Sequence, residues 1–167
     1  MSKLILANDG IDEVGKTILE KAGYTVITEK VNQEKLIDEI NSKNIVALTV
    51  RSATKVRKDL IDACPNLKVI GRGGVGMDNI DVAYAKNKGI AVINTPASSS
   101  VSVAELVFAH IFSGSRFIQI TNRQMPSNGF DKFDDLKKKY AKGVELKGKT
   151  IGIVGFGRIG QTVAKIA

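Results

Sequence analysis

Cysteine and histidine are almost missing from this sequence, which contains one residue of each type. The single cysteine, Cys64, excludes an internal disulfide and suits a reducing compartment. No histidine or basic cluster adjoins Cys64 to stabilise a thiolate, so we interpret it as a buried structural thiol rather than a reactive one. The single histidine, His110, falls on an apolar helical stripe, and we interpret it as a packed helix residue rather than a catalytic base. We predict no metal site.

Long apolar runs are also absent. No stretch is long enough to span a bilayer, and the N-terminus shows no signal-peptide pattern, because Met1-Ser2-Lys3 leads directly into a short apolar run. We therefore expect a soluble, cytoplasmic protein without a membrane partner.

The third absence is tryptophan, and it bears on the net charge of +8. Much of the positive excess lies in one segment, whose lysines face only Glu145: Lys137, Lys138, Lys139, Lys142, Lys147 and Lys149. Nucleic-acid binding is one interpretation of such a segment, but no aromatic side chains alternate with the lysines as a stacking platform would require. A solvated lysine-rich loop is the simpler interpretation, and we predict no nucleic-acid partner.

Short apolar runs alternate with amphipathic stretches over the first part of the chain. The runs contain β-branched residues without polar alternation, which is typical of strands buried on both faces; they are 4–6, 24–27, 45–48, 67–70 and 90–93. The intervening stretches place apolar residues at helical spacing, as in Leu36, Ile37 and Ile40. This βαβ rhythm predicts an α/β fold with a flavodoxin-like, doubly wound parallel sheet of five strands.

The rhythm breaks at Thr95-Pro96, and small hydroxylated residues follow as a linker. We predict a first domain over residues 1–98 and a second part over residues 99–167. The second part is expected to contain a helix over about 101–120, a polar loop to residue 149, a strand over 150–154 and the start of a helix. It resembles the opening of a Rossmann domain.

Two glycine loops match the pattern G-x-G-x-x-G. The first, Gly71 to Gly76, has no acid after the next strand to hold a ribose, so it fits a smaller anion better than a dinucleotide. Arg72 offers a guanidinium there, and Gly73, Gly74 and Val75 are candidates for a nest of bare backbone N–H groups. A tight strand-to-helix turn without a ligand explains the pattern equally well.

The second loop runs from Gly155 to Gly160 and opens a helix without an acidic cap. It favours a dinucleotide whose pyrophosphate lies at the helix N-terminus, over a glycine-rich turn without a ligand. The ribose-binding acid would fall near position 175 by the usual spacing of roughly 20 residues, so the choice between NAD and NADP stays open.

Several motifs in this order resemble the D-2-hydroxyacid dehydrogenase family. They are Val50-Arg51-Ser52-Ala53-Thr54-Lys55-Val56, Gly71 to Asp81, Asn94-Thr95-Pro96, Val103-Ala104-Glu105-Leu106 and Glu145 to Gly160. The resemblance covers residue 45 to the end. Within the family, the chain is most similar to the branch that oxidises D-3-phosphoglycerate to 3-phosphohydroxypyruvate in serine biosynthesis.

The resemblance implies a substrate-binding domain and an NAD-binding domain with the active site between them. It assigns Gly155, Gly157, Arg158, Ile159 and Gly160 to NAD. It places Gly73, Gly74 and Val75 at the substrate carboxylate, with Val75 also at the nicotinamide, and it assigns the substrate phosphate to Arg51 and Arg72. Many relatives have threonine at position 75, so a hydroxyl contact is not expected there.

The family's catalytic Arg, Glu and His are expected beyond residue 167, which predicts that the 167-residue chain alone is inactive. The resemblance also implies a homodimer or higher homo-oligomer, formed through a dimerisation arm over residues 121–145. This arm contains apolar residues at helical spacing: Phe130, Phe133, Leu136 and Tyr140. The alternatives are a dehydrogenase for another D-2-hydroxy acid and a non-enzymatic NAD-binding relative, such as the C-terminal binding protein corepressors.

Overall fold

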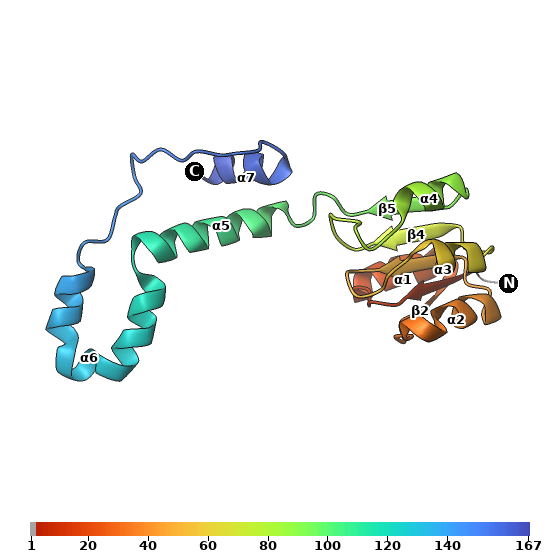
Figure 1. Cartoon of the computed structure of the whole chain (residues 1–167), viewed down its shortest axis with the longest axis horizontal. Coiled ribbons are helices and arrows are strands. Elements are labelled where there is room, and N and C mark those ends of the chain that lie inside the picture. The colour runs from red at the N-terminus through yellow and green to blue at the C-terminus, as the bar shows by residue number, and fades with distance from the viewer. Residues whose placement is uncertain (1–2) are drawn as a thin grey trace. The chain divides into compact units, whose positions relative to one another are not determined.

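The computed structural model describes residues 3–167, and the chain divides into two compact units at Ser98. The first unit contains a five-stranded parallel sheet in the order β2-β1-β3-β4-β5 (Figure 1). The strands are β1 (Lys3–Ala7), β2 (Tyr24–Ile27), β3 (Ala47–Val50), β4 (Val69–Arg72) and β5 (Ala91–Asn94). This strand order confirms the predicted doubly wound α/β fold.

Four α-helices connect these strands: α1 (Glu13–Lys21), α2 (Leu36–Ser42), α3 (Lys58–Ala63) and α4 (Val82–Asn87), with the short 3-10 helix η1 (Gln33–Lys35) before α2. Right-handed crossovers place α1 on one face of the sheet and the other three on the opposite face. The main core lies on that second face, where Leu36, Ile40 and Leu60 pack with Leu48 and Ile70. Helix α1 has no buried residue, so the sheet face that it covers is partly exposed to solvent.

Several element boundaries differ from those expected. Ile45 and Leu67 are buried as predicted, but β3 and β4 each begin two residues later, where ladder pairing starts. Residues 78–81, between the first glycine loop and α4, form a turn that pairs with Val56 through a parallel bridge to Ile80, so α4 begins only at Val82.

The second unit is helical in the described residues: α5 (Ser100–Ser115), α6 (Ile118–Tyr140) and α7 (Arg158–Ile166). The expectation of a polar loop from residue 121 is therefore wrong up to Tyr140. Helix α6 has two arms separated by non-helical dihedral angles at Lys132 (Figure 1). Tyr140 joins the arms, because its ring lies 5.5 Å from that of Phe117 and its hydroxyl donates to Gln124 Oε1 at 2.6 Å.

Two further expectations fail in this unit. Residues 150–154 form no strand, because no other extended segment in residues 99–167 offers a ladder of hydrogen bonds. His110 is exposed rather than packed, since α5 buries only Ser100 and Ala104. Over residues 3–167, no single helix is long and apolar enough to cross a membrane. Helix α5 and the first part of α6 reach that length and apolarity only together, as a pair bent by 58°.

Candidate functional site

A cleft of about 770 Å³ lies in the first unit at the carboxyl ends of the strands. Its floor includes Thr49, Gly71 and Ile93, which are neighbours across β3, β4 and β5, and the loop after β1 forms a wall with Asp9 and Asp12. Ligands of doubly wound folds bind outside the carboxyl ends of strands. The topology therefore makes this cleft the candidate site of the first unit.

The cleft contains both arginines singled out from the sequence. Arg72 ends β4 opposite Val50, and Arg51 is the first residue after β3, so adjacent strands deliver both side chains to one edge. Within residues 3–98, neither guanidinium group forms an ion pair or hydrogen bond, and Arg72 Nε and Thr49 Oγ1 are buried without a partner. Buried polar groups are normally hydrogen-bonded, so these atoms favour an anionic ligand that accepts from arginine.

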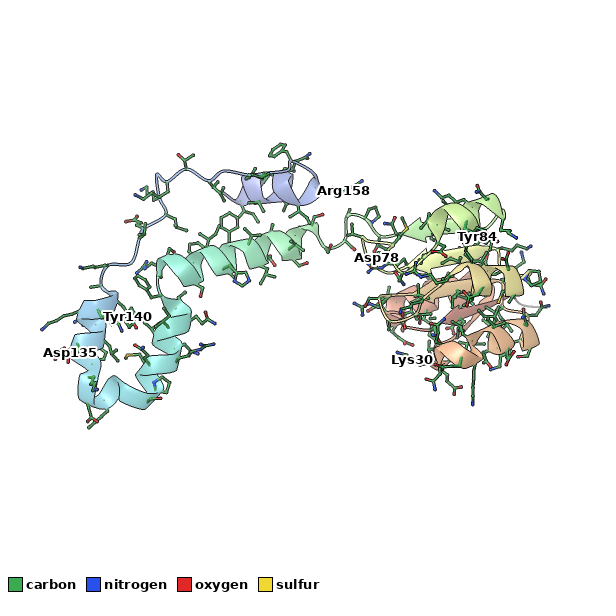
Figure 2. The ribbon with its side chains drawn as sticks, in the orientation of Figure 1. Lys30, Asp78, Tyr84, Asp135, Tyr140 and Arg158 are labelled. Atoms are coloured by element: carbon green, nitrogen blue, oxygen red, sulfur yellow. The ribbon has the colours of Figure 1, made fainter. Side chains whose placement is uncertain are left out.

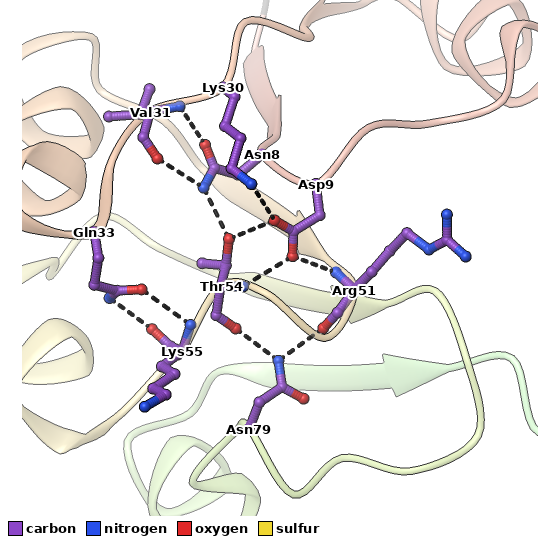
Figure 3. A network of polar contacts seen from close by, with 9 residues as sticks. All are labelled: Asn8, Asp9, Lys30, Val31, Gln33, Arg51, Thr54, Lys55 and Asn79. Carbon is purple, nitrogen blue, oxygen red and sulfur yellow. Dashed lines mark hydrogen bonds and ion pairs between the residues drawn. The ribbon is translucent and has the colours of Figure 1, made fainter.

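Asp9 is the acid nearest to the loop that carries Arg51, yet its carboxylate is occupied by other groups. Oδ2 accepts from the backbone N–H groups of Arg51 at 2.7 Å and Thr54 at 3.0 Å, and Oδ1 accepts from the Thr54 hydroxyl at 2.8 Å (Figure 3). Burial raises the pKa of Asp9, but these hydrogen bonds and the Lys30 charge outweigh it and lower the pKa below its usual 3.8. Asp9 is therefore ionised without neutralising the Arg51 guanidinium.

Lys30 adds a third cation that the sequence analysis did not single out. Its Nζ lies 3.9 Å from Asp9 Oδ1, and it lines a hollow of about 340 Å³ together with Arg51 and Ser52. Figure 3 shows the Arg51 guanidinium pointing away from the surrounding polar network. The sequence pattern did not reveal Lys30 because it follows β2, which is separated from β3 by β1 in the sheet.

The first glycine loop differs from the predicted nest. Gly73 N–H donates to Val50 O at 2.9 Å and Gly74 N–H donates to Arg72 O at 2.9 Å, so two of the three expected bare N–H groups are engaged. The prediction of bare N–H groups is wrong for Gly73 and Gly74, because both groups donate to backbone carbonyls of the turn itself. Val75 is exposed, and its N–H has no hydrogen bond within the first unit.

Gly74 has a different role in this loop. Its φ is +150°, and a Cβ at this position would overlap the Arg72 guanidinium. Glycine therefore leaves the space in which the arginine head lies. Asn94 Nδ2 donates to Val75 O at 2.7 Å, and Thr95 N–H donates to Gly74 O at 3.1 Å, so β5 holds the other side of the loop.

The second glycine loop belongs to the second unit. Gly155 has φ +93°, and a Cβ at Gly160 would overlap Gly155 O. Gly157, the N-cap of α7, borders open space, because a Cβ there would meet no atom within 4 Å. These are the three roles of glycines in a dinucleotide loop: a tight turn, close packing and open backbone for a pyrophosphate. Helix α7 has no acid in its first turn and begins with Arg158, so its N-terminus fits an anion. Figure 2 shows Arg158 at this end of α7.

Ile159 follows Arg158 in the same turn and is exposed, so the loop residues assigned to NAD from the sequence lie together. Among residues 3–167, no group of three or more His, Cys, Asp or Glu side chains is placed to hold a metal ion. The candidate chemistry is therefore anion binding at two glycine loops, one in each unit.

Comparison with known proteins gives a consistent result. Residues 5–161 match the profile of the D-isomer specific 2-hydroxyacid dehydrogenase catalytic domain. The chain is 42% identical over 163 residues to a D-3-phosphoglycerate dehydrogenase of Methanocaldococcus jannaschii, covering 98% of the chain and 30% of that protein. It is 43% identical over 161 residues to a hydroxypyruvate reductase of Thermotoga maritima, covering 96% and 50%.

A solved structure gives the same picture in three dimensions. The NAD+-bound 3-phosphoglycerate dehydrogenase of Entamoeba histolytica is similar with a TM-score of 0.71 at 32% identity, covering 99% of this chain and 50% of that one. The chain thus spans 30% to 50% of the length of these relatives.

Proposed function

The chain belongs to the D-isomer specific 2-hydroxyacid dehydrogenase family, and from this membership we propose that the full-length protein oxidises D-3-phosphoglycerate with NAD. The observation that carries the substrate choice is the pair Arg51 and Arg72, which share one cleft and have no ion partner in residues 3–98. A phosphate can accept two parallel hydrogen bonds from each guanidinium group, which a neutral hydroxyl on the substrate cannot do. The hydroxy acid would thus be held by its phosphate end.

The rest of the substrate would lie toward the first glycine loop. Val75 has an N–H without a partner in the first unit, and we propose that this group donates to the substrate carboxylate, while Gly73 and Gly74 give the loop its shape. Gly74 also lets the Arg72 head approach the backbone closely. Lys30 contributes positive charge at the Arg51 side of the cleft.

The second loop fits NAD by its geometry. Gly155, Gly157 and Gly160 meet the three steric demands of a pyrophosphate loop, and Arg158 and Ile159 form the first turn of α7. Bound NAD would supply the acceptor for the hydride that leaves C2 of the hydroxy acid. The family's catalytic Arg, Glu and His are assigned to no residue of this chain, so we expect no turnover from residues 1–167 alone.

The test compares D-3-phosphoglycerate with D-glycerate as substrates of the full-length protein, followed by NADH absorbance. We expect kcat/KM to favour the phosphorylated acid by at least about a hundredfold, because each lost charged hydrogen-bonding partner costs about 1.5–3 kcal/mol. NADH production by the 167-residue chain would contradict its proposed inactivity.

Oxidation or reduction of an unphosphorylated acid is the second candidate function. The Thermotoga maritima hydroxypyruvate reductase is 43% identical to the chain, so identity alone does not separate the two activities. Equal kcat/KM values for D-glycerate and D-3-phosphoglycerate would favour this candidate. No turnover with either acid would favour the non-enzymatic alternative.

We further propose a homodimer in which α6 contacts a second copy. Phe130 is fully exposed and Phe133 is half exposed on this helix. Large apolar side chains exposed at a surface mark contact sites, and these two rings flank the break in α6 at Lys132.

A further inference from the structure

Asp9 holds the loop that carries Arg51 by accepting hydrogen bonds from the backbone N–H groups of that loop. One carboxylate oxygen accepts from the N–H groups of Arg51 and Thr54, at 2.7 Å and 3.0 Å, and the other accepts from the Thr54 hydroxyl. The side chain of Asp9 is only 4% exposed. A buried, ionised acceptor makes hydrogen bonds of about twice the strength of neutral ones, so these contacts fix the loop firmly.

Asn79 holds the same loop by donating hydrogen bonds to the backbone carbonyl groups of that loop. Its Nδ2 donates to Arg51 O at 2.8 Å and to Thr54 O at 2.7 Å, and its side chain lies in the interior (Figure 3). Asp9 and Asn79 together bind the backbone N–H and C=O groups of both Arg51 and Thr54. We name this pair of side chains, Asp9 and Asn79, the loop clamp.

The loop clamp joins three strands at their carboxyl ends. Asp9 follows β1, Arg51 follows β3 and Asn79 lies in the segment after β4, and β3 lies between the other two strands. Asn79 therefore ties the Arg51 loop to the segment that begins with Arg72. None of these hydrogen bonds involves the Arg51 guanidinium group, which stays available to a ligand.

We propose that Asp9 and Asn79 are positioning residues that set the Arg51 backbone so that its guanidinium group meets the same anion as that of Arg72. This inference rests on the proposed function for the identity of the anion, a phosphorylated 2-hydroxy acid. The clamp acts through Arg51, because the Asp9 carboxylate is almost fully buried and both of its oxygens are bonded to the loop. Without it, the Arg51 side chain starts from a mobile backbone and loses affinity through added conformational entropy.

The fold is expected to survive loss of the clamp, because other contacts also join these segments. Val56 N–H donates to Asn79 O at 2.9 Å, and Asp81 N–H donates to Val56 O at 3.0 Å. The Arg57 Nη1 group also donates to Asp81 Oδ1 at 3.0 Å. Substitution of the Asn79 side chain leaves these contacts in place.

The test uses Asp9→Asn and Asn79→Ala in the full-length protein. Asparagine keeps the shape of Asp9 but is neutral and has one acceptor oxygen instead of two, so the charge-assisted hydrogen bonds to the loop are weakened. We expect KM for D-3-phosphoglycerate to rise about tenfold in each variant, with kcat changed less than about twofold and kinetics with D-glycerate unaffected. Equal losses for both acids would overturn the proposal.

Arg51→Ala provides the decisive comparison. If the clamp acts through Arg51, adding Asp9→Asn to Arg51→Ala raises KM no further, whereas a general structural role makes the two losses multiply. Gln33→Ala is the matched control, because Gln33 binds the N–H and C=O of the neighbouring Lys55 at 3.0 Å and 2.9 Å without contacting Arg51. We expect this variant to keep the wild-type KM.

Residue-resolved amide hydrogen exchange separates failure of the clamp from failure of the proposed function. The Arg51 and Thr54 amides should exchange at least about tenfold faster in Asp9→Ala, but not in Gln33→Ala, because both amides lose their shared acceptor Oδ2, which is worth more than about 1.4 kcal/mol to each. A wild type without preference for the phosphorylated acid would remove the proposed function, and the exchange rates would still decide the clamp. Unchanged exchange at both amides would overturn it.

Discussion

Cys64 lies in the interior of the first unit, just after α3, and is completely buried. Burial raises the pKa of its thiol to about 11, so the thiolate is scarce at neutral pH. This agrees with the structural role that the sequence predicted for it. We predict that Cys64 does not react with a thiol reagent such as DTNB at pH 8 in the native protein, but reacts fully in denaturant. Rapid reaction without denaturant would contradict the burial.

Asp9 gives a pH dependence with a defined sign. Its pKa in the fold is lower than the usual 3.8, so its ionised form stabilises the fold above about that pH, and the contribution is lost as pH falls through the folded pKa. The unfolding free energy of wild type minus that of Asp9→Asn should therefore be larger at pH 6 than at pH 3. Denaturant titration at both pH values measures this difference. A constant difference would show that Asp9 does not act as a carboxylate.

The roles of single residues were only partly readable from the sequence. Arg51 and Arg72 were predicted to share a site, and the cleft brings them together. Asp9 and Asn79 were not predicted, because positions 9, 51 and 79 approach one another only through the strand order β1-β3-β4. The available indication was that Asn8-Asp9 directly follows an apolar run at a strand end.

At the scale of elements, apolar runs located all five strands, but apart from β2 each strand ends one or two residues beyond its run. Gly71 and Arg72 belong to β4 although glycine is uncommon in strands, because the neighbouring strands supply hydrogen bonds at that point. Dependence on a neighbouring strand also explains why residues 150–154 form no strand: their apolar pattern predicts one, but no partner strand lies in residues 99–167. Phe130, Phe133, Leu136 and Tyr140 recur at helical spacing and indicate this helix correctly, whereas the expected polar loop over the same residues is wrong.

The second glycine loop offers a test of an element's packing. Gly160 lies so close to Gly155 O that a Cβ would overlap it. We predict that Gly160→Ala displaces the start of α7 and raises the Kd for NAD of the full-length protein about tenfold or more, as overpacking costs about 1–3 kcal/mol. Gly152→Ala is the control, because a Cβ there meets no atom within 4 Å. Equal NAD affinity in both variants, measured by calorimetry, would refute the packing role.

At the scale of the whole molecule, the exposed rings of α6 predict the state of assembly. Phe130→Asp and Phe133→Asp should each weaken the proposed homodimer, because each removes an apolar contact of about 1.5–3 kcal/mol that two-fold symmetry repeats. Light scattering of the full-length protein at micromolar concentration measures the mass. Val14→Asp, which changes an exposed valine of α1, serves as the control. A monomeric wild type would show that the interface does not exist.

The central claim is that Arg51 and Arg72 bind one phosphate, and selectivity between two substrates tests it most directly. The measurement is the kcat/KM of full-length wild type and Arg72→Ala for D-3-phosphoglycerate and D-glycerate, with Lys86→Ala as a control for loss of one exposed positive charge. Arg72→Ala should lower the value for the phosphorylated acid about tenfold to a hundredfold, through a higher KM, and leave D-glycerate within about twofold. Equal losses for both acids would contradict the claim and show that Arg72 only supports the loop.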